Sequence, residues 1–338
     1  MTLRIDAGGD LSGSLVNTPA HAKQAEELGA DGVILTETKH DPFVALTMAA
    51  QATTRIDLFV AIAVAFARNP MTLAMAANDI QEISGGRFIL GLGSQVQQHI
   101  ERRFSMPWSH PADRMKDFVL ATRAIWSSWA TGERLQYRGE FYSHTLMTPF
   151  FSPGPNPHGN PPVWLAAVGE RMTETAGEVA DGMVAHPFTT RRYIDEVTIP
   201  ALRRGASAAG RETVPGIALP VFVAIGRDEQ EVRAAAIEVG KQIAFYGSTP
   251  TYLPVLDIHG WADRAEQLSA AARRGEWESM GSIVTEEMLH EFAVVGSPEQ
   301  VAAGIRARYG DVLERVTFSA PYPVARETWA ALYAALRD

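Results

Sequence analysis

The sequence contains no cysteine, which excludes disulfide bonds, thiolate metal sites and a cysteine nucleophile. It also has no apolar run of about 18 residues, the length that a membrane-spanning helix requires. Residues 1–10 have an early acidic residue and lack the apolar core of a secretory signal peptide. We therefore expect a cytoplasmic protein without a membrane partner.

Lysine is also scarce, because only four of the 30 basic residues are lysines. The formal net charge is −9 and no basic run exceeds two residues, so we expect no nucleic-acid partner. Any anion site must use arginine, backbone N–H groups or helix N-termini. The nine histidines show no metal-ligand spacing, so no metal site is expected.

What the sequence does contain is a repeated strand–helix unit. Apolar runs typical of buried parallel strands alternate with amphipathic stretches that begin at Asn-Pro or Asp-Pro pairs and end at glycine. The eight predicted strands lie within residues 3–6, 31–37, 56–66, 87–93, 161–169, 181–188, 216–226 and 316–321. This count favours a closed α/β TIM (β/α)8 barrel over an open sheet.

Two stretches interrupt this rhythm. Residues 133–160 predict a hairpin followed by a Pro/Gly-rich loop, and residues 248–292 are mostly helical with no strand. Both are long for connections in a barrel, and long connections commonly carry lids or binding loops. We expect one barrel domain over residues 1–338 with these two insertions.

The segment GGRFILGLGSQ, residues 85–95, is similar to a dinucleotide-binding loop but departs from it. The G-x-G-x-x-G fingerprint needs a third glycine where this chain has Val96, and the segment belongs to a fourth strand–helix unit. In a barrel, Gly91 and Gly93 end a strand on the active-site face. They either admit a flat ligand close to the backbone or simply form a tight turn.

The chain as a whole resembles the bacterial luciferase-like monooxygenases, in particular the branch that uses the deazaflavin coenzyme F420. The resemblance rests on GADGVILTETKH, VAIAVAF followed by RNPMTLA, SGGRFILGLGSQ, PPVWLAAVGERMTETAGEVADGMVAH and VVGSPEQVAAGI. It implies a cofactor ring in the barrel mouth, resting on a bulge of the third strand with a cis peptide at Ala63-Val64. An ordinary buried strand is the alternative for this segment.

The resemblance also implies which other residues hold the cofactor. The fourth strand end contributes Gly93, Ser94 and His99, and Thr189 follows the sixth strand. A helix begins at Glu170, where its N–H groups would bind a phosphate. The loop before this helix, matched to the ribityl and phosphate site, consists of Ala166, Ala167, Val168 and Gly169.

Glu37, His40 and His99 are the predicted proton-transfer residues. Relatives have Asp-His where this chain has Glu37-Thr38, so the acid or base is either Glu37 or the displaced His40. His40-Asp41 could equally be a surface loop in which Asp41 caps a helix.

The expected function is hydride transfer between F420 and a small organic substrate, in a homodimer or higher homo-oligomer. Three alternatives remain open. They are an FMN-dependent two-component monooxygenase of the same fold, a non-catalytic flavin-binding or assembly subunit, and an unrelated barrel lyase or isomerase. The resemblance also implies that a sugar phosphate is not the substrate. Family members that act on sugar phosphates have a carboxylate where this chain has Val96 and use lysines in later loops, whereas no lysine follows Lys241 here.

Overall fold

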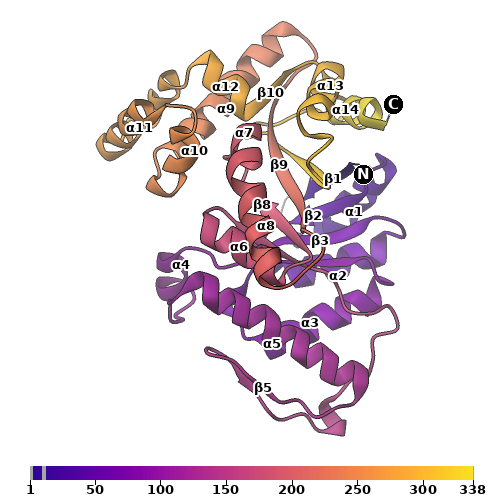
Figure 1. Cartoon of the computed structure of the whole chain (residues 1–338). Coiled ribbons are helices and arrows are strands. Elements are labelled where there is room, and N and C mark those ends of the chain that lie inside the picture. Colours follow the sequence, from indigo (N-terminus) through magenta and orange to yellow (C-terminus); the bar gives the residue numbers. More distant parts are fainter. Residues whose placement is uncertain (1–2, 10–12, 338) are drawn as a thin grey trace. The chain divides into compact units, whose positions relative to one another are not determined.

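A computed structural model describes residues 3–9 and 13–337 (Figure 1). The chain has the predicted α/β TIM-barrel fold, in which parallel strands alternate with helices. The described residues form two compact units. Of the described residues, the N-terminal unit comprises 6–9, 13–184 and 201–216, and the C-terminal unit comprises 3–5, 185–200 and 217–337.

In the N-terminal unit the parallel strand order is β1-β2-β3-β4-β7-β8. The outer helices pack in sequence, α1 on α2, α2 on α3, α3 on α5 and α5 on α6. The strands are β1 (Arg4–Gly9), β2 (Gly32–Leu35), β3 (Asp57–Val64), β4 (Phe88–Gly93), β7 (Val163–Ala167) and β8 (Gly182–Ala185). The helices are α1 (Thr18–Glu27), α2 (Pro42–Ala52), α3 (Pro70–Ile83), α5 (Pro111–Thr131) and α6 (Glu170–Val179).

Side-chain caps begin the helices where the sequence predicts them. Asp41 accepts a hydrogen bond from the N–H of Phe43 at 2.8 Å, and Asn69 accepts one from the N–H of Thr72 at 3.0 Å. A proline occupies the first position of α2 and of α3, where its missing N–H costs nothing. Asp41 therefore caps α2, which leaves the predicted role of the neighbouring His40 untested.

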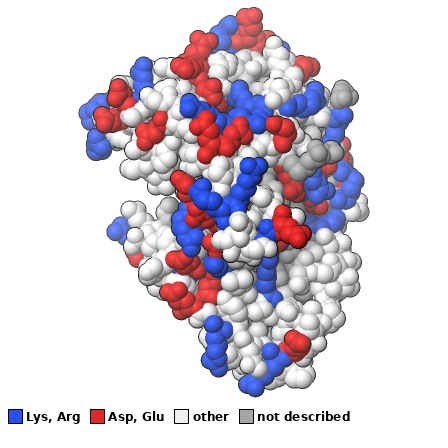
Figure 2. All heavy atoms as spheres, in the orientation of Figure 1, with Lys and Arg blue, Asp and Glu red and all other residues white. Residues whose placement is uncertain are grey.

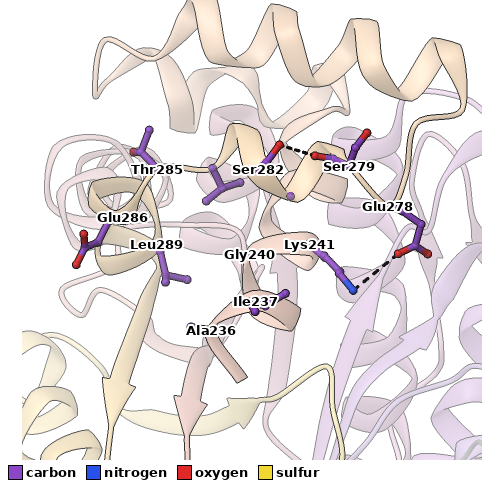
Figure 3. A pocket seen from close by; sticks show the side chains of 12 residues that line it. Ala236, Ile237, Gly240, Lys241, Glu278, Ser279, Ser282, Thr285, Glu286 and Leu289 are labelled. Atoms are coloured by element: carbon purple, nitrogen blue, oxygen red, sulfur yellow. Dashed lines mark hydrogen bonds and ion pairs between the residues drawn. The ribbon is translucent and has the colours of Figure 1, made fainter. Parts of the chain in front are cut away.

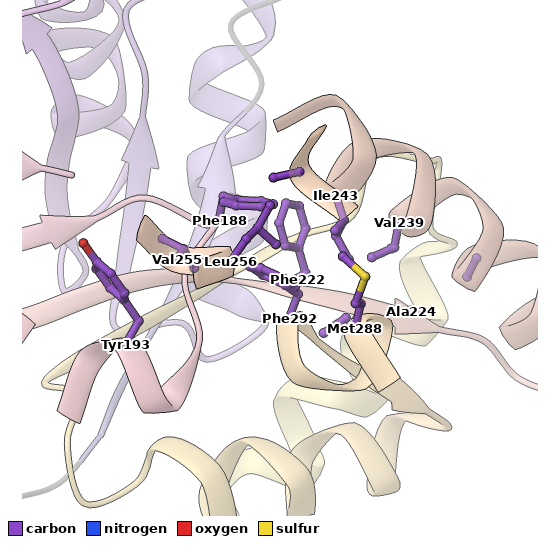
Figure 4. Packing of buried hydrophobic residues seen from close by; sticks show 13 residues of the cluster. Phe188, Tyr193, Phe222, Ala224, Val239, Ile243, Val255, Leu256, Met288 and Phe292 are labelled. Atoms are coloured by element: carbon purple, nitrogen blue, oxygen red, sulfur yellow. The ribbon is translucent and has the colours of Figure 1, made fainter. Parts of the chain in front are cut away.

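In the C-terminal unit, β9 (Gly216–Ile225) pairs in parallel with β10 (Ala293–Gly296) and β11 (Arg315–Ser319). The short strand β10 was not predicted. Helices α9 (Glu229–Gly247), α13 (Pro298–Tyr309) and α14 (Arg326–Arg337) belong to the same unit. Its apolar core gathers aromatic and aliphatic side chains from the segment after β8, from β9, from α9 and from the second insertion. They include Phe188, Phe222, Ile243, Leu256, Met288 and Phe292 (Figure 4).

Both predicted insertions are confirmed. Residues 133–160 contain the hairpin β5 (Tyr137–Arg138) and β6 (Ser143–His144), which pair antiparallel. Residues 248–292, all of which the structure describes, contain α10 (Leu253–Asp257), α11 (Ala262–Arg274) and α12 (Glu286–Phe292) and form no strand.

Acidic and basic side chains are interspersed on the face shown in Figure 2. Many form ion pairs within one unit, such as Arg191 with Asp311 at 2.6 Å and Arg204 with Glu170 at 2.6 Å. No helix among the described residues combines the length and the apolar composition needed to cross a membrane.

Candidate functional site

The C-terminal half of β3 is bulged. Val60 is paired with Leu90 and Ala63 with Leu92, so β3 has one more residue than β4 between these pairs. The cis peptide lies within the bulge, at Ala61-Ile62. The prediction of a cis bond at Ala63-Val64 is therefore wrong, because these two residues have already returned to register with β4.

Two glycines of β4 provide the room that the bulge occupies. A Cβ on Gly91 would overlap the carbonyl oxygen of Val60, and a Cβ on Gly93 would lie 2.8 Å from Cδ1 of Ile62. Ala63 and Val64, the predicted cofactor contacts, are fully buried, whereas Ala61 and Ile62 are partly exposed. The glycines thus accommodate a neighbouring strand, which neither interpretation of the sequence anticipated.

The end of β2 holds the bulge from its other side. The Thr36 hydroxyl donates to the carbonyl oxygen of Ala61 at 2.7 Å. The Glu37 N–H donates to the carbonyl oxygen of Ile62 at 3.2 Å, and Glu37 Oε2 accepts a hydrogen bond from the N–H of Val64 at 2.8 Å. The structure therefore brings the predicted catalytic Glu37 together with the predicted cofactor contact Val64.

Arg68, which the sequence analysis did not select, completes this arrangement. Its Nη1 donates to Glu37 Oε2 at 2.7 Å and its Nη2 to Asp41 Oδ2 at 2.8 Å. Its guanidinium also lies 5.3 Å from the centre of the Phe43 ring. Burial opposes the charge of Arg68, but the two carboxylates outweigh it and raise the arginine's pKa. The sequence signal that could have identified Arg68 is its position just after a predicted strand end on the active-site face.

The two predicted catalytic histidines differ in their surroundings. His40 is partly buried, and its Nε2 lies 3.0 Å from the carbonyl oxygen of Gly13. Because a carbonyl only accepts, His40 carries its proton on Nε2, which leaves Nδ1 as an acceptor. His99 is exposed on α4 (Gln97–Arg102), and no described residue hydrogen bonds to its ring.

Ser94, a predicted cofactor contact, donates its hydroxyl hydrogen to the backbone oxygen of Gln95 at 3.1 Å.

The predicted phosphate loop leads into α6 as expected. Gly169 is the exposed N-cap residue, and a Cβ placed on it would meet nothing within 4 Å. No described residue accepts a hydrogen bond from the N–H groups of residues 170–172, as is usual for a first helical turn. Ala166 and Val168 are partly buried and Ala167 is buried. The helix end therefore offers free donors to an anion.

Thr189 belongs to the C-terminal unit, where it is buried beside a polar pair. His186 Nδ1 accepts a hydrogen bond from the N–H of Phe188 at 3.1 Å, and its Nε2 lies 3.0 Å from the Tyr252 hydroxyl. Burial lowers the pKa of His186 to about 4 and raises that of Tyr252 to about 12. His186 is therefore neutral, with its proton on Nε2, and the Tyr252 oxygen accepts that proton's hydrogen bond.

The C-terminal unit also has a hollow of about 580 Å³ between α9 and α12 (Figure 3). Ile237, Val284 and Leu289 give it apolar walls, and its lysine, Lys241, lies 2.8 Å from Glu238 and 3.8 Å from Glu278. None of the predicted site residues lines it. Among the described residues, no group of three or more histidine, aspartate or glutamate side chains is arranged to hold a metal ion.

Comparisons with known proteins show which sequences and folds this chain resembles. The sequence profile described as luciferase-like monooxygenase matches residues 1–315. An uncharacterized protein of Mycobacterium tuberculosis is 50% identical over 311 residues, 90% of this chain and 92% of that protein. The 5,10-methylenetetrahydromethanopterin reductase of Methanolobus tindarius is 29% identical over 290 residues, 84% of each chain. The solved coenzyme F420 dependent tetrahydromethanopterin reductase of Methanopyrus kandleri superposes with a TM-score of 0.81 at 20% identity, covering 100% of this chain and 99% of that one.

Proposed function

Because the chain belongs to the luciferase-like monooxygenase family, we propose that it is an F420-dependent oxidoreductase acting on a small organic substrate. Support for the deazaflavin comes from the related reductases, one of which is F420-dependent by name. The family's own description favours a second candidate, an FMN-dependent monooxygenase supplied by a partner reductase.

The main structural support for the proposal is the arrangement of two features within the N-terminal unit, the β3 bulge and the N-terminus of α6. The partly exposed bulge of β3 and the free N-terminus of α6 lie at the ends of two strands, β3 and β7, that only β4 separates. Neighbouring strands are about 4.8 Å apart, so these two features lie roughly 10 Å apart across the sheet. The spacing suits a molecule with a flat ring at one end of a short chain and a phosphate at the other.

Each part of the cofactor has residues suited to it. The ring would lie against Ala61 and Ile62, with Ala63 and Val64 supporting them from the buried side. Gly93 and Ser94 would border the ring, and residues 166–169 with the first turn of α6 would hold the phosphate. When bound, F420 supplies the hydride-transfer chemistry. His40 Nδ1 and the exposed His99 ring are the proposed groups that move the accompanying proton.

Titration of the cofactor-free protein with F420 and with FMN, followed by fluorescence, tests the proposal. We expect tight binding of F420, and binding of FMN alone would favour the monooxygenase. Turnover is then measured with His40→Ala and His99→Ala. If both variants retained the wild-type rate and pH profile, their proposed role in proton transfer would be wrong.

A further inference from the structure

The two carboxylate oxygens of Glu37 have different surroundings. Oε2 accepts hydrogen bonds from the Val64 N–H at 2.8 Å and from Arg68 Nη1 at 2.7 Å. No described residue donates to Oε1, although the Glu37 side chain is only 6% exposed. Oε1 is not among the buried polar atoms that lack a partner, so it is the part of this side chain that stays open to solvent and can accept a hydrogen bond from a ligand.

The contacts on Oε2 fix the position of Glu37. Oε2 accepts one hydrogen bond from a backbone N–H and one from an arginine, and hydrogen bonds to charged donors are among the stronger ones in proteins. Arg68 is itself fixed by a second carboxylate, since its Nη2 donates to Asp41 at 2.8 Å. The result is a carboxylate held in one position beside the bulge, with Oε1 as its unoccupied acceptor.

We propose that Glu37 is a positioning residue, whose Oε1 accepts a hydrogen bond from the imide N–H of the ring system bound on the β3 bulge. This inference rests on the proposed function, which places the ring against Ala61 and Ile62. The imide N–H is a donor that deazaflavin and flavin rings share. Carbonyl or phosphate oxygens would be repelled by Oε1, so the free oxygen also selects which edge of the ring faces β2.

The variant Glu37→Gln tests this role because its amide has one allowed orientation. Both groups at Oε2, the Val64 N–H and Arg68, are donors, so the Gln carbonyl oxygen must take that position. The amide NH2 is then forced into the place of Oε1. The variant keeps the hydrogen bonds that support the bulge. However, its NH2 group, a donor, would face the imide N–H of the ring, which is also a donor.

We expect Glu37→Gln to weaken binding of F420 by about tenfold or more, measured by fluorescence titration with circular dichroism as the check on folding. Glu82→Gln, at an exposed position of α3, is the matched control and should bind as the wild type does. If Glu37 only supported the bulge, the protein would bind ligands that differ at the imide nitrogen equally well.

A second measurement uses the wild-type protein and therefore does not depend on how the variant folds. Lumiflavin should bind about tenfold more tightly than 3-methyllumiflavin, which has no imide N–H. Equal affinities, or unchanged F420 binding by Glu37→Gln, would overturn the inference. If F420, FMN and lumiflavin all failed to bind the wild type, the proposed function itself would be wrong.

Discussion

Gly91 passes so close to Val60 that a Cβ atom on the glycine would overlap the valine carbonyl oxygen. The same Cβ would lie 3.0 Å from the ring of Phe59, which is itself fully buried. The register of β3 against β4 shifts immediately after Val60. A glycine is therefore required at position 91 because of the path of the neighbouring strand β3, whether or not a ligand binds.

Gly91→Ala should lower the free energy of unfolding by about 1–3 kcal/mol, the usual cost of adding a methyl group to a packed interior. The measurement is urea denaturation. Gly240→Ala in α9 is the contrasting variant, because a Cβ there meets nothing within 4 Å. It should stabilise the protein by about 0.5–1 kcal/mol, the helix-propensity gain of alanine over glycine. Equal effects of the two substitutions would contradict this account of Gly91.

The barrel could be predicted from sequence because its signals are local. Continuous apolar runs mark strands that are buried on both faces, and Asp41 and Asn69 each precede a proline at a helix start. The strand β10 was missed for a physical reason. It has four residues and follows α12 directly, without a turn signal between Phe292 and Ala293.

The candidate site was only partly predictable, because its contacts join segments far apart in the chain. Glu37 and Arg68 are 31 residues apart, and neither residue's neighbours in sequence indicate the other. The cis peptide bond was placed two residues too late, since its position depends on how β3 pairs with β4. The roles of Glu37, His40, His99 and the cofactor contacts remain predictions.

Asp117 holds the hairpin of the first insertion onto α5. Its buried carboxylate accepts hydrogen bonds from the N–H groups of Phe141 and Tyr142, at 2.6 and 2.9 Å, and from the Tyr137 hydroxyl. Asp117→Asn keeps an acceptor at one oxygen position but removes the charge and puts an NH2 at the other, so it should destabilise the protein by about 1.5–3 kcal/mol. Limited proteolysis would show faster cleavage between residues 133 and 146, whereas Tyr137→Phe, which removes one donor only, should cost less.

His186 makes stability depend on pH in a defined direction. Burial lowers its pKa to about 4, whereas a histidine in an unfolded chain titrates near 6.5. Between these values the unfolded state binds more protons than the native state. Stability is therefore full above pH 6.5 and is lost as the pH falls toward 4, by about 3 kcal/mol in total.

Urea denaturation at pH 7 and pH 4 would measure this contribution. His186→Gln should lose less stability over that interval than the wild type, by about 3 kcal/mol. His158→Gln, which changes an exposed histidine, should keep the wild-type dependence. In the NMR spectrum of the wild type, the His186 ring should be neutral at pH 6 with its proton on Nε2. A proton on Nδ1 would contradict the hydrogen bond from Phe188.

Glu170 should weaken the binding of an anion at the α6 N-terminus. Its exposed carboxylate occupies the first helical turn, where the free N–H groups would otherwise meet only the ligand phosphate. Arg204 partly neutralises it, with a separation of 2.6 Å. Glu170→Gln removes the repulsion, while Arg204 keeps its ion pair with Glu174 at 2.9 Å, so F420 or FMN should bind about two- to fivefold more tightly at low salt. The gain should shrink as ionic strength rises, because exposed charges are screened. Weaker binding by the variant would place the phosphate elsewhere.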